Sequence, residues 1–250
     1  MSNNSYSSGW VNPYNNTMSN IYQSNMNLIT QQAIQRSQLF GAVNSSAAFR
    51  VKRAARVKSL SEREQSEAVR FAKYQGTMYK ERGSSMVPAT VAAIFAKNVG
   101  AKPAEVTPTF KVLLDVYKQR AKQQGAPAND VARTLAYCIS ANYFYFTGGT
   151  GVPETQVAAL RSKIRTALSE DAKFREMSDA QKRQTSESMV ILTHLVALGV
   201  EEVADKAPAY KRSQVKAGFR KLAGISLQGL LGVDPKRVSF GAGGLVIRPA

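Results

Sequence analysis

The sequence predicts a mainly α-helical protein: a multi-helix bundle that ends in a short β-hairpin and begins with an extended N-terminal arm. Apolar residues recur at helical spacing between residues 84 and 231, and start and stop residues separate these stretches. Two short β-prone runs around glycines near the C-terminus predict the hairpin. Hydrophobic residues make up 44% of the 250-residue chain, which is enough to bury a core.

The first predicted segment, residues 1–48, contains one charged residue, Arg36, and is rich in Asn, Ser, Gln and Tyr. The segment has too little apolar surface to offset the entropy cost of becoming ordered on its own. Its scattered apolar side chains are suited to pockets on another copy of the chain. We therefore interpret the segment as an assembly arm, with Tyr6, Trp10, Tyr14, Tyr22, Leu39 and Phe40 as its expected contact residues.

The second predicted segment, residues 49–83, holds ten basic and four acidic residues. Five of the basic residues fall within residues 50–58. Ser61 and Glu64 then form a capping box, in which each side chain bonds the backbone of the other residue at a helix start. The pattern predicts a helix from about Glu62 to Lys80.

The third predicted segment, residues 84–250, is a helical domain. Its start signals are Pro88, the pair Thr107 and Pro108, Asn129, Pro153, and a second capping box at Ser178 and Gln181. In chain order, we expect helices at residues 88–98, 108–124, 130–147, from 153 to about 168, 179–204, and 209–231 with a break near Gly224.

The C-terminal end is expected to form the hairpin. The runs Arg237–Phe240 and Leu245–Arg248 flank the glycine-rich turn Gly241–Gly244. The glycines at 148, 149 and 151 resemble a phosphate-binding loop only superficially, because no Gly-Lys-Ser/Thr ending follows them. A helix end followed by a turn is the better interpretation.

No membrane span is expected. The longest apolar stretch, Met189–Val200, is interrupted by Thr193, His194 and Gly199, and a span needs ~20 apolar residues. The N-terminus lacks the positively charged region followed by an apolar stretch that is typical of a signal peptide. We expect a mature exported form, periplasmic or extracellular, with a cytoplasmic protein as the alternative.

From about Thr107 to the end, the chain resembles a bacterial family of unknown function whose members are usually exported. The resemblance rests on these residues: Ala141–Tyr143, Thr147–Gly149, Val152–Pro153, Ala167–Leu168, Asp171–Phe174, Ser178–Lys182, Leu230–Pro235 and Gly244–Ile247. It implies an α-helical domain that ends in a short β-element, and a bacterial exported origin. It implies no activity and no catalytic residues.

We expect no catalytic site, metal site or cofactor. The chain has one cysteine, Cys138, and one histidine, His194, each within an apolar helical stretch. A metal site usually needs several such ligands, and a general base near pH 7 needs a nucleophile beside it. A hydrolase that pairs Cys138 with His194 is the least favoured alternative.

Positive charge is the strongest functional signal. The formal net charge is +17, which favours a polyanionic partner: nucleic acid, anionic lipid or an acidic polysaccharide. Two basic blocks flank the helical centre. The predicted polyanion-binding residues are Arg50, Lys52, Arg53, Arg56, Lys58, Lys211, Arg212, Lys216, Arg220 and Lys221. The aromatic run Tyr143–Phe146 is expected to pack mainly in the core or at a protein interface, with base stacking as the alternative.

These observations lead to two hypotheses on function. The first is a non-enzymatic, exported or surface-associated structural protein, a filament or ring subunit joined to other copies through its N-terminal arm. The alternative is a basic protein that binds nucleic acid or another polyanion. Salt-dependent affinity distinguishes the second from the first, because phosphate contacts release counterions.

Overall fold

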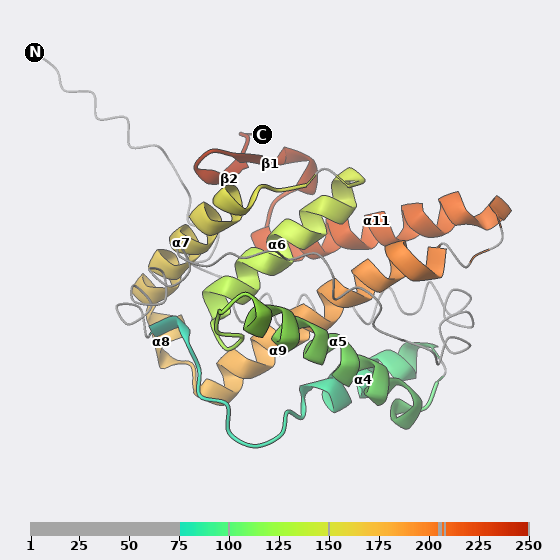
Figure 1. Cartoon of the computed structure of the whole chain (residues 1–250), viewed down its shortest axis with the longest axis horizontal. Helices are drawn as coiled ribbons and strands as arrows, with labels where there is room; N and C mark the ends of the chain where they lie inside the picture. Colours follow the sequence, from blue (N-terminus) through green and yellow to red (C-terminus); the bar gives the residue numbers. More distant parts are fainter. Residues whose placement is uncertain (1–75, 100, 150, 205–206, 208, 250) are drawn as a thin grey trace, which may run out of the picture.

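The computed structural model describes residues 76–99, 101–149, 151–204, 207 and 209–249, which form a helical bundle with a C-terminal two-stranded hairpin (Figure 1). The predicted fold class is confirmed for these residues. The predicted arm and residues 49–75 of the basic segment lie outside them. The elements are α4 (Val87–Val99), α5 (Pro103–Gln123), α6 (Val131–Thr147), α7 (Glu154–Glu170), α8 (Ala172–Glu176), α9 (Asp179–Leu198), the π-helical η2 (Gly199–Val203), α11 (Ala209–Leu231), the 3-10 helix η3 (Pro235–Arg237), β1 (Val238–Gly241) and β2 (Gly244–Ile247).

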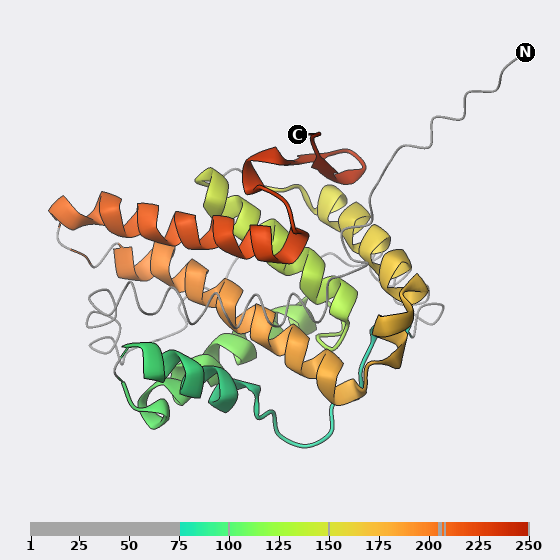
Figure 2. The same cartoon turned by 180° about the vertical axis from the view of Figure 1, so that it is seen from behind.

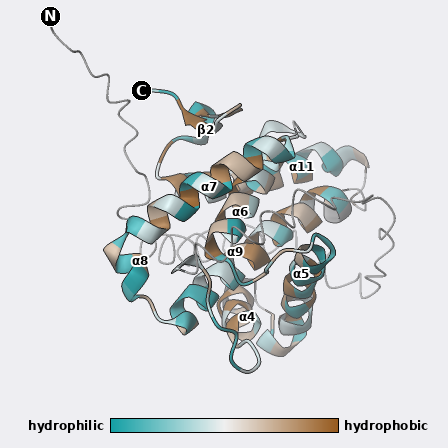
Figure 3. Ribbon diagram, turned by 60° about the vertical axis from the view of Figure 1, so that its left-hand side comes forward, coloured by the Kyte–Doolittle hydropathy of each residue, from teal (hydrophilic) through white to brown (hydrophobic). Residues whose placement is uncertain are grey.

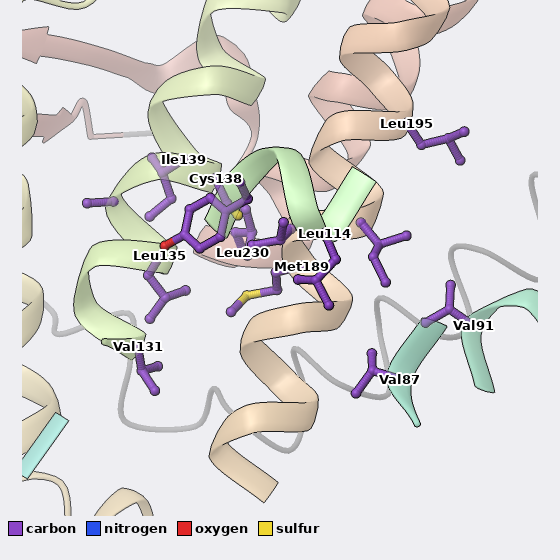
Figure 4. Close-up of a cluster of buried hydrophobic side chains, with 14 of the residues drawn as sticks. Val87, Val91, Leu114, Val131, Leu135, Cys138, Ile139, Met189, Leu195 and Leu230 are labelled. Atoms are coloured by element: carbon purple, nitrogen blue, oxygen red, sulfur yellow. The ribbon is translucent and has the colours of Figure 1, made fainter. Parts of the chain in front are cut away.

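Helix α6 lies at the centre of the bundle and packs against α7, α9 and α11 (Figure 2). Its residues Leu135, Cys138 and Ile139 are fully buried. Figure 4 shows side chains of α6 together with Met189 from α9 and Leu230 from α11. Each large apolar side chain removed from water contributes about 1.5–3 kcal/mol, so this cluster supplies much of the stability of the bundle.

The remaining helices pack around this centre. Helix α4 lies against α5, and both contact α9, while α7 carries the hairpin through β2. Figure 3 shows that α5 and α7 carry hydrophobic residues on one side and hydrophilic residues on the other, which is the pattern of helices that cover a core. A second, smaller cluster of Ala204, Val215 and Phe219 joins α11 to the C-terminal end of η2.

Several predicted boundaries are confirmed. Ser178 and Gln181 form the expected capping box at the start of α9. Gly148 ends α6 in the left-handed conformation, with φ of 84°. The predicted hairpin is an antiparallel pair in which Phe240 lies opposite Leu245.

Two predicted helix starts are wrong. Helix α5 begins at Pro103, so that Pro108 lies inside the helix. Pro103 is already a proline at the first helical position, which favours the earlier start. The N-cap of α6 is Asp130, one residue after the predicted Asn129. The Asn129 side chain instead donates to the carbonyl oxygen of Tyr79, at 2.6 Å.

The predicted break near Gly224 is also wrong, because α11 is continuous from Ala209 to Leu231. A Cβ atom on Gly224 would lie 2.8 Å from the ring of Phe146, closer than atoms pack. The glycine lets α11 approach α6, and the sequence alone does not distinguish this packing role from a helix break.

The predicted helix over residues 62–80 does not reach Lys80. Residues 78–80 are not helical, and Met78 forms an isolated antiparallel bridge with Asp130. The Tyr79 amide donates to the carbonyl oxygen of Asn129, at 3.1 Å. These long-range bonds hold the backbone in an extended form and compete with helix formation.

Among the helices of the described residues, none combines the length and the apolar composition that a membrane span requires.

Gly199 gives the first testable prediction. A Cβ atom at this position would lie 2.0 Å from the buried ring of Phe219, so Gly199→Ala forces α9 and α11 apart. Overpacking of this kind destabilises a fold by about 1–3 kcal/mol. We expect the free energy of unfolding, measured by urea denaturation, to fall by that amount.

The matched control is Gly151→Ala. No heavy atom lies within 4 Å of a Cβ built there, so the change is expected to stay within about 0.5 kcal/mol. Equal free energies of unfolding for the two variants would contradict the close approach at Gly199.

Candidate functional site

The basic residues of α11 form the candidate site that the sequence predicted. Lys211, Arg212, Arg220 and Lys221 are exposed, and Lys216 is half-buried. The other predicted block, Arg50, Lys52, Arg53, Arg56 and Lys58, lies outside the described residues, as do the predicted arm contacts Tyr6, Trp10, Tyr14, Tyr22, Leu39 and Phe40.

Three of these cations share one stripe of the helix. Arg212, Lys216 and Arg220 are spaced at four-residue intervals, which places them above one another on a helix surface. No acidic residue occurs within the sequence of α11. We call this stripe, together with Lys211 and Lys221, the α11 basic face.

A pocket of about 390 Å³ opens beside the α11 basic face. Lys216 and Arg220 line one side of it, while Phe144 and Tyr145 of α6 line another. Gly148, Gly149, Val200 and Glu201 complete the lining. Cations thus lie beside aromatic rings, a combination that suits anionic ligands with a flat or aromatic part.

Gly148 lets the Arg220 side chain approach the end of α6. A Cβ atom on Gly148 would lie 3.1 Å from an Arg220 guanidinium nitrogen. The last carbonyl groups of a helix carry partial negative charge, which attracts a cation. The Arg220 side chain therefore lies close to the end of α6, the helix that also provides the aromatic rings of the pocket.

The aromatic side of the pocket is also fixed. The Tyr145 hydroxyl donates to Glu201 Oε1 at 2.7 Å. Burial, together with the neighbouring Glu201 carboxylate, raises the pKa of Tyr145, so its hydroxyl stays protonated near pH 7. The ring of Phe144 packs edge-to-face on that of Tyr145, with centroids 5.1 Å apart.

A further aromatic ring lies at the start of α11. Tyr210 is 79% exposed, and the Lys211 ammonium nitrogen lies 5.5 Å from its ring centroid. An exposed tyrosine beside a cation is available for a partner.

His194 and Cys138 have different hydrogen-bond partners. His194 Nδ1 lies 3.1 Å from the carbonyl oxygen of Val190. Because that oxygen only accepts, Nδ1 carries the proton, and the neutral ring accepts at Nε2 from the Tyr137 hydroxyl, 3.0 Å away. Burial is the main cause that lowers the pKa of His194 to about 4, and the positive charge of Arg120 adds to it.

Cys138 is fully buried, and its sulfur pairs with the side chain of Thr193. Burial raises the pKa of the Cys138 thiol to about 12, so the thiolate that nucleophilic chemistry needs is not formed near neutral pH. Within the described residues, no group of three or more His, Cys, Asp and Glu side chains is placed to hold a metal ion.

Two buried charge clusters join residues 76–86, the connecting segment, to the helices. Asp130 accepts from Thr77 at 2.9 Å and pairs with Arg165 at 2.7 Å. Sequence reasoning missed this cluster, because its members lie up to 88 residues apart and only the Asp130 cap has a local signal.

The second cluster surrounds Glu187, which is 1% exposed. It pairs with Arg183 at 3.1 Å and Lys118 at 3.3 Å, and it accepts from the Ser85 hydroxyl. Arg183 also donates to the carbonyl oxygen of Arg82, at 2.9 Å. A buried carboxylate with this many donors fixes the position of the connecting segment.

The chain was compared with known protein families, curated proteins and solved structures. A family model described as a family of unknown function (DUF6683) matches residues 1–248. No curated protein and no solved structure matches the chain. The match is longer than the resemblance seen in the sequence, which began near residue 107, and it includes the N-terminal segments.

The low pKa of His194 predicts how stability depends on pH. In the unfolded chain, the His194 side chain becomes protonated below about pH 6.5. In the folded chain it stays neutral until the pH falls to about 4. The unfolded state therefore holds more protons between these values, so stability is fully present above pH 6.5 and is lost as the pH falls. The total loss approaches about 3 kcal/mol.

Urea denaturation at pH values from 7 to 4.5 measures this loss. His194 is the only histidine in the chain, so His194→Gln should flatten the dependence in this window whatever it does to the absolute stability. An equally steep dependence in the variant would rule out His194 as its origin.

Proposed function

The chain belongs to DUF6683, a family of unknown function, and we propose that it is a non-enzymatic protein that binds a polyanion along the α11 basic face. The observation that carries the proposal is the stripe of Arg212, Lys216 and Arg220 beside a pocket of about 390 Å³. Regularly spaced cations neutralise successive charges of a polymer and release its counterions.

The lining of this pocket favours single-stranded nucleic acid among polyanions. Phe144 and Tyr145 provide ring surface beside the cations Lys216 and Arg220. Stacking of a base on an aromatic side chain contributes about 1–3 kcal/mol, and an acidic polysaccharide has no comparable flat aromatic group. Exposed Tyr210 extends the same combination toward the start of α11.

Assembly through residues 1–48 and an exported location stay predictions. They rest on the composition of the arm and on the family resemblance, and the arm lies outside the described residues. Assembly and polyanion binding are compatible, because repeated subunits present repeated basic faces to one polymer.

The test of polyanion binding is a salt titration with a fluorescent oligothymidine, followed by anisotropy. We expect affinity to fall steeply with salt. Replacing Lys216 and Arg220 by Gln in one variant should reduce the slope of log affinity against log salt by about 0.7 for each lost phosphate contact.

The matched control replaces Lys111 and Lys173, which are exposed on α5 and α8, by Gln. It removes the same charge away from the pocket, so its slope should match that of the unchanged protein. A Phe144→Leu variant should bind oligothymidine about tenfold more weakly but retain its affinity for heparin. Equal slopes for both double variants would refute the proposal.

The assembly prediction is tested by sedimentation of the full-length chain over a range of concentrations. Deletion of residues 1–40 should leave the helical circular dichroism signal largely unchanged and make the protein monomeric. A full-length protein that is already monomeric at high concentration, or a truncated one that still assembles, would exclude assembly through the arm.

A further inference from the structure

A second cavity, of about 230 Å³, lies between α5, α6 and the start of α7. Each of these helices contributes one arginine to its lining: Arg120, Arg133 and Arg161. Glu154 is the one acidic residue among the residues that line it. Three cations against one carboxylate give the cavity a net positive lining.

The three arginines differ in their exposure to solvent. Arg161 lines the cavity and is only 7% exposed. Arg133 is half-buried and donates to the side chain of Gln124. Arg120 is exposed. The three lining arginines thus range in exposure from buried Arg161 to exposed Arg120.

The tyrosine walls are held in place by hydrogen bonds to the core. The Tyr117 and Thr134 hydroxyl oxygens are 3.0 Å apart, and Thr134 donates onward to the carbonyl oxygen of Asp130. Tyr137 donates to His194. The two tyrosine rings also pack together, with centroids 5.3 Å apart. These contacts leave little rearrangement to be made on binding, which favours affinity.

We propose that this cavity binds a phosphate group, either as free phosphate or as the phosphate of a small monoester. A guanidinium presents a planar fork of donors that matches two oxygens of an oxyanion. One such fork satisfies a planar carboxylate, whereas three forks from three helices suit a tetrahedral group with oxygens on several sides. The volume of about 230 Å³ lies below that of most drug-sized pockets, so the rest of the ligand is small.

The test is isothermal titration of the full-length protein with inorganic phosphate and, separately, with glycerol 3-phosphate, at constant ionic strength set by chloride. We expect saturable binding of one ligand per chain in at least one of the two titrations. Comparing the two affinities shows whether the cavity prefers the free or the esterified phosphate. Arg120→Gln should weaken binding at least about tenfold, because it removes a charge-assisted hydrogen bond, which is stronger than one between neutral groups.

The matched control is Lys111→Gln, which removes the same charge from an exposed position of the same helix. It should bind phosphate as the unchanged protein does. Lys216→Gln on the α11 basic face should also leave this affinity unchanged, which separates the cavity from the proposed polyanion site. Arg120→Lys should recover only part of the affinity, since it restores the charge without the fork.

Three outcomes would overturn the proposal. The first is that neither inorganic phosphate nor glycerol 3-phosphate shows saturable binding. The second is an equal loss of affinity in Lys111→Gln and Arg120→Gln. The third is that succinate, titrated as a ligand with planar carboxylates, binds at least as tightly as phosphate. Arg120 is an exposed residue, so both variants are expected to fold, and circular dichroism before the titration is the check.

Discussion

Burial of α6 is the constraint on which the rest of the structure depends. Residues from its start to its middle pack against α7, α9 and α11, and Tyr117 of α5 contacts Thr134 and Tyr137. This packing fixes how α6 is rotated and how far it is shifted along its axis. The same helix lines both cavities: Arg133 and Tyr137 face one, and Phe144 and Tyr145 face the other. Because a buried helix tolerates little rotation, the core that stabilises the protein also determines where these side chains point.

Buried charges complete this arrangement at the other end of the molecule. Asp130 caps α6 while it binds Thr77 and Arg165, and Glu187 binds cations from α5 and α9. Such pairs are costly to desolvate and add little net stability, but breaking one by removing a single partner is strongly destabilising. Their effect here is to specify where the connecting segment lies on the bundle.

The elements that could be predicted from sequence are those decided by near neighbours. The capping box at Ser178 and the glycine end at Gly148 need only a few adjacent residues, and both are found where expected. The predicted helix break at Gly224 was wrong because the role of this glycine depends on Phe146, which lies far along the chain. The basic face of α11 lies within one helix and was visible as a charge run. The arginines of the second cavity lie on three helices, so no local pattern joins them.

The charge distribution of α11 is unfavourable for folding, and this is the strongest physical reason to look for an external anion. Like charges at four-residue spacing repel by a few tenths of a kcal/mol, and cations near a helix start oppose its dipole. The Arg212, Lys216 and Arg220 stripe incurs the first cost, and Lys211 adds to the second. The other half of α11 is anchored in the core through residues such as Leu227 and Leu230. Anchoring there offsets the repulsion at the start of the helix, and binding to a polyanion would relieve that repulsion.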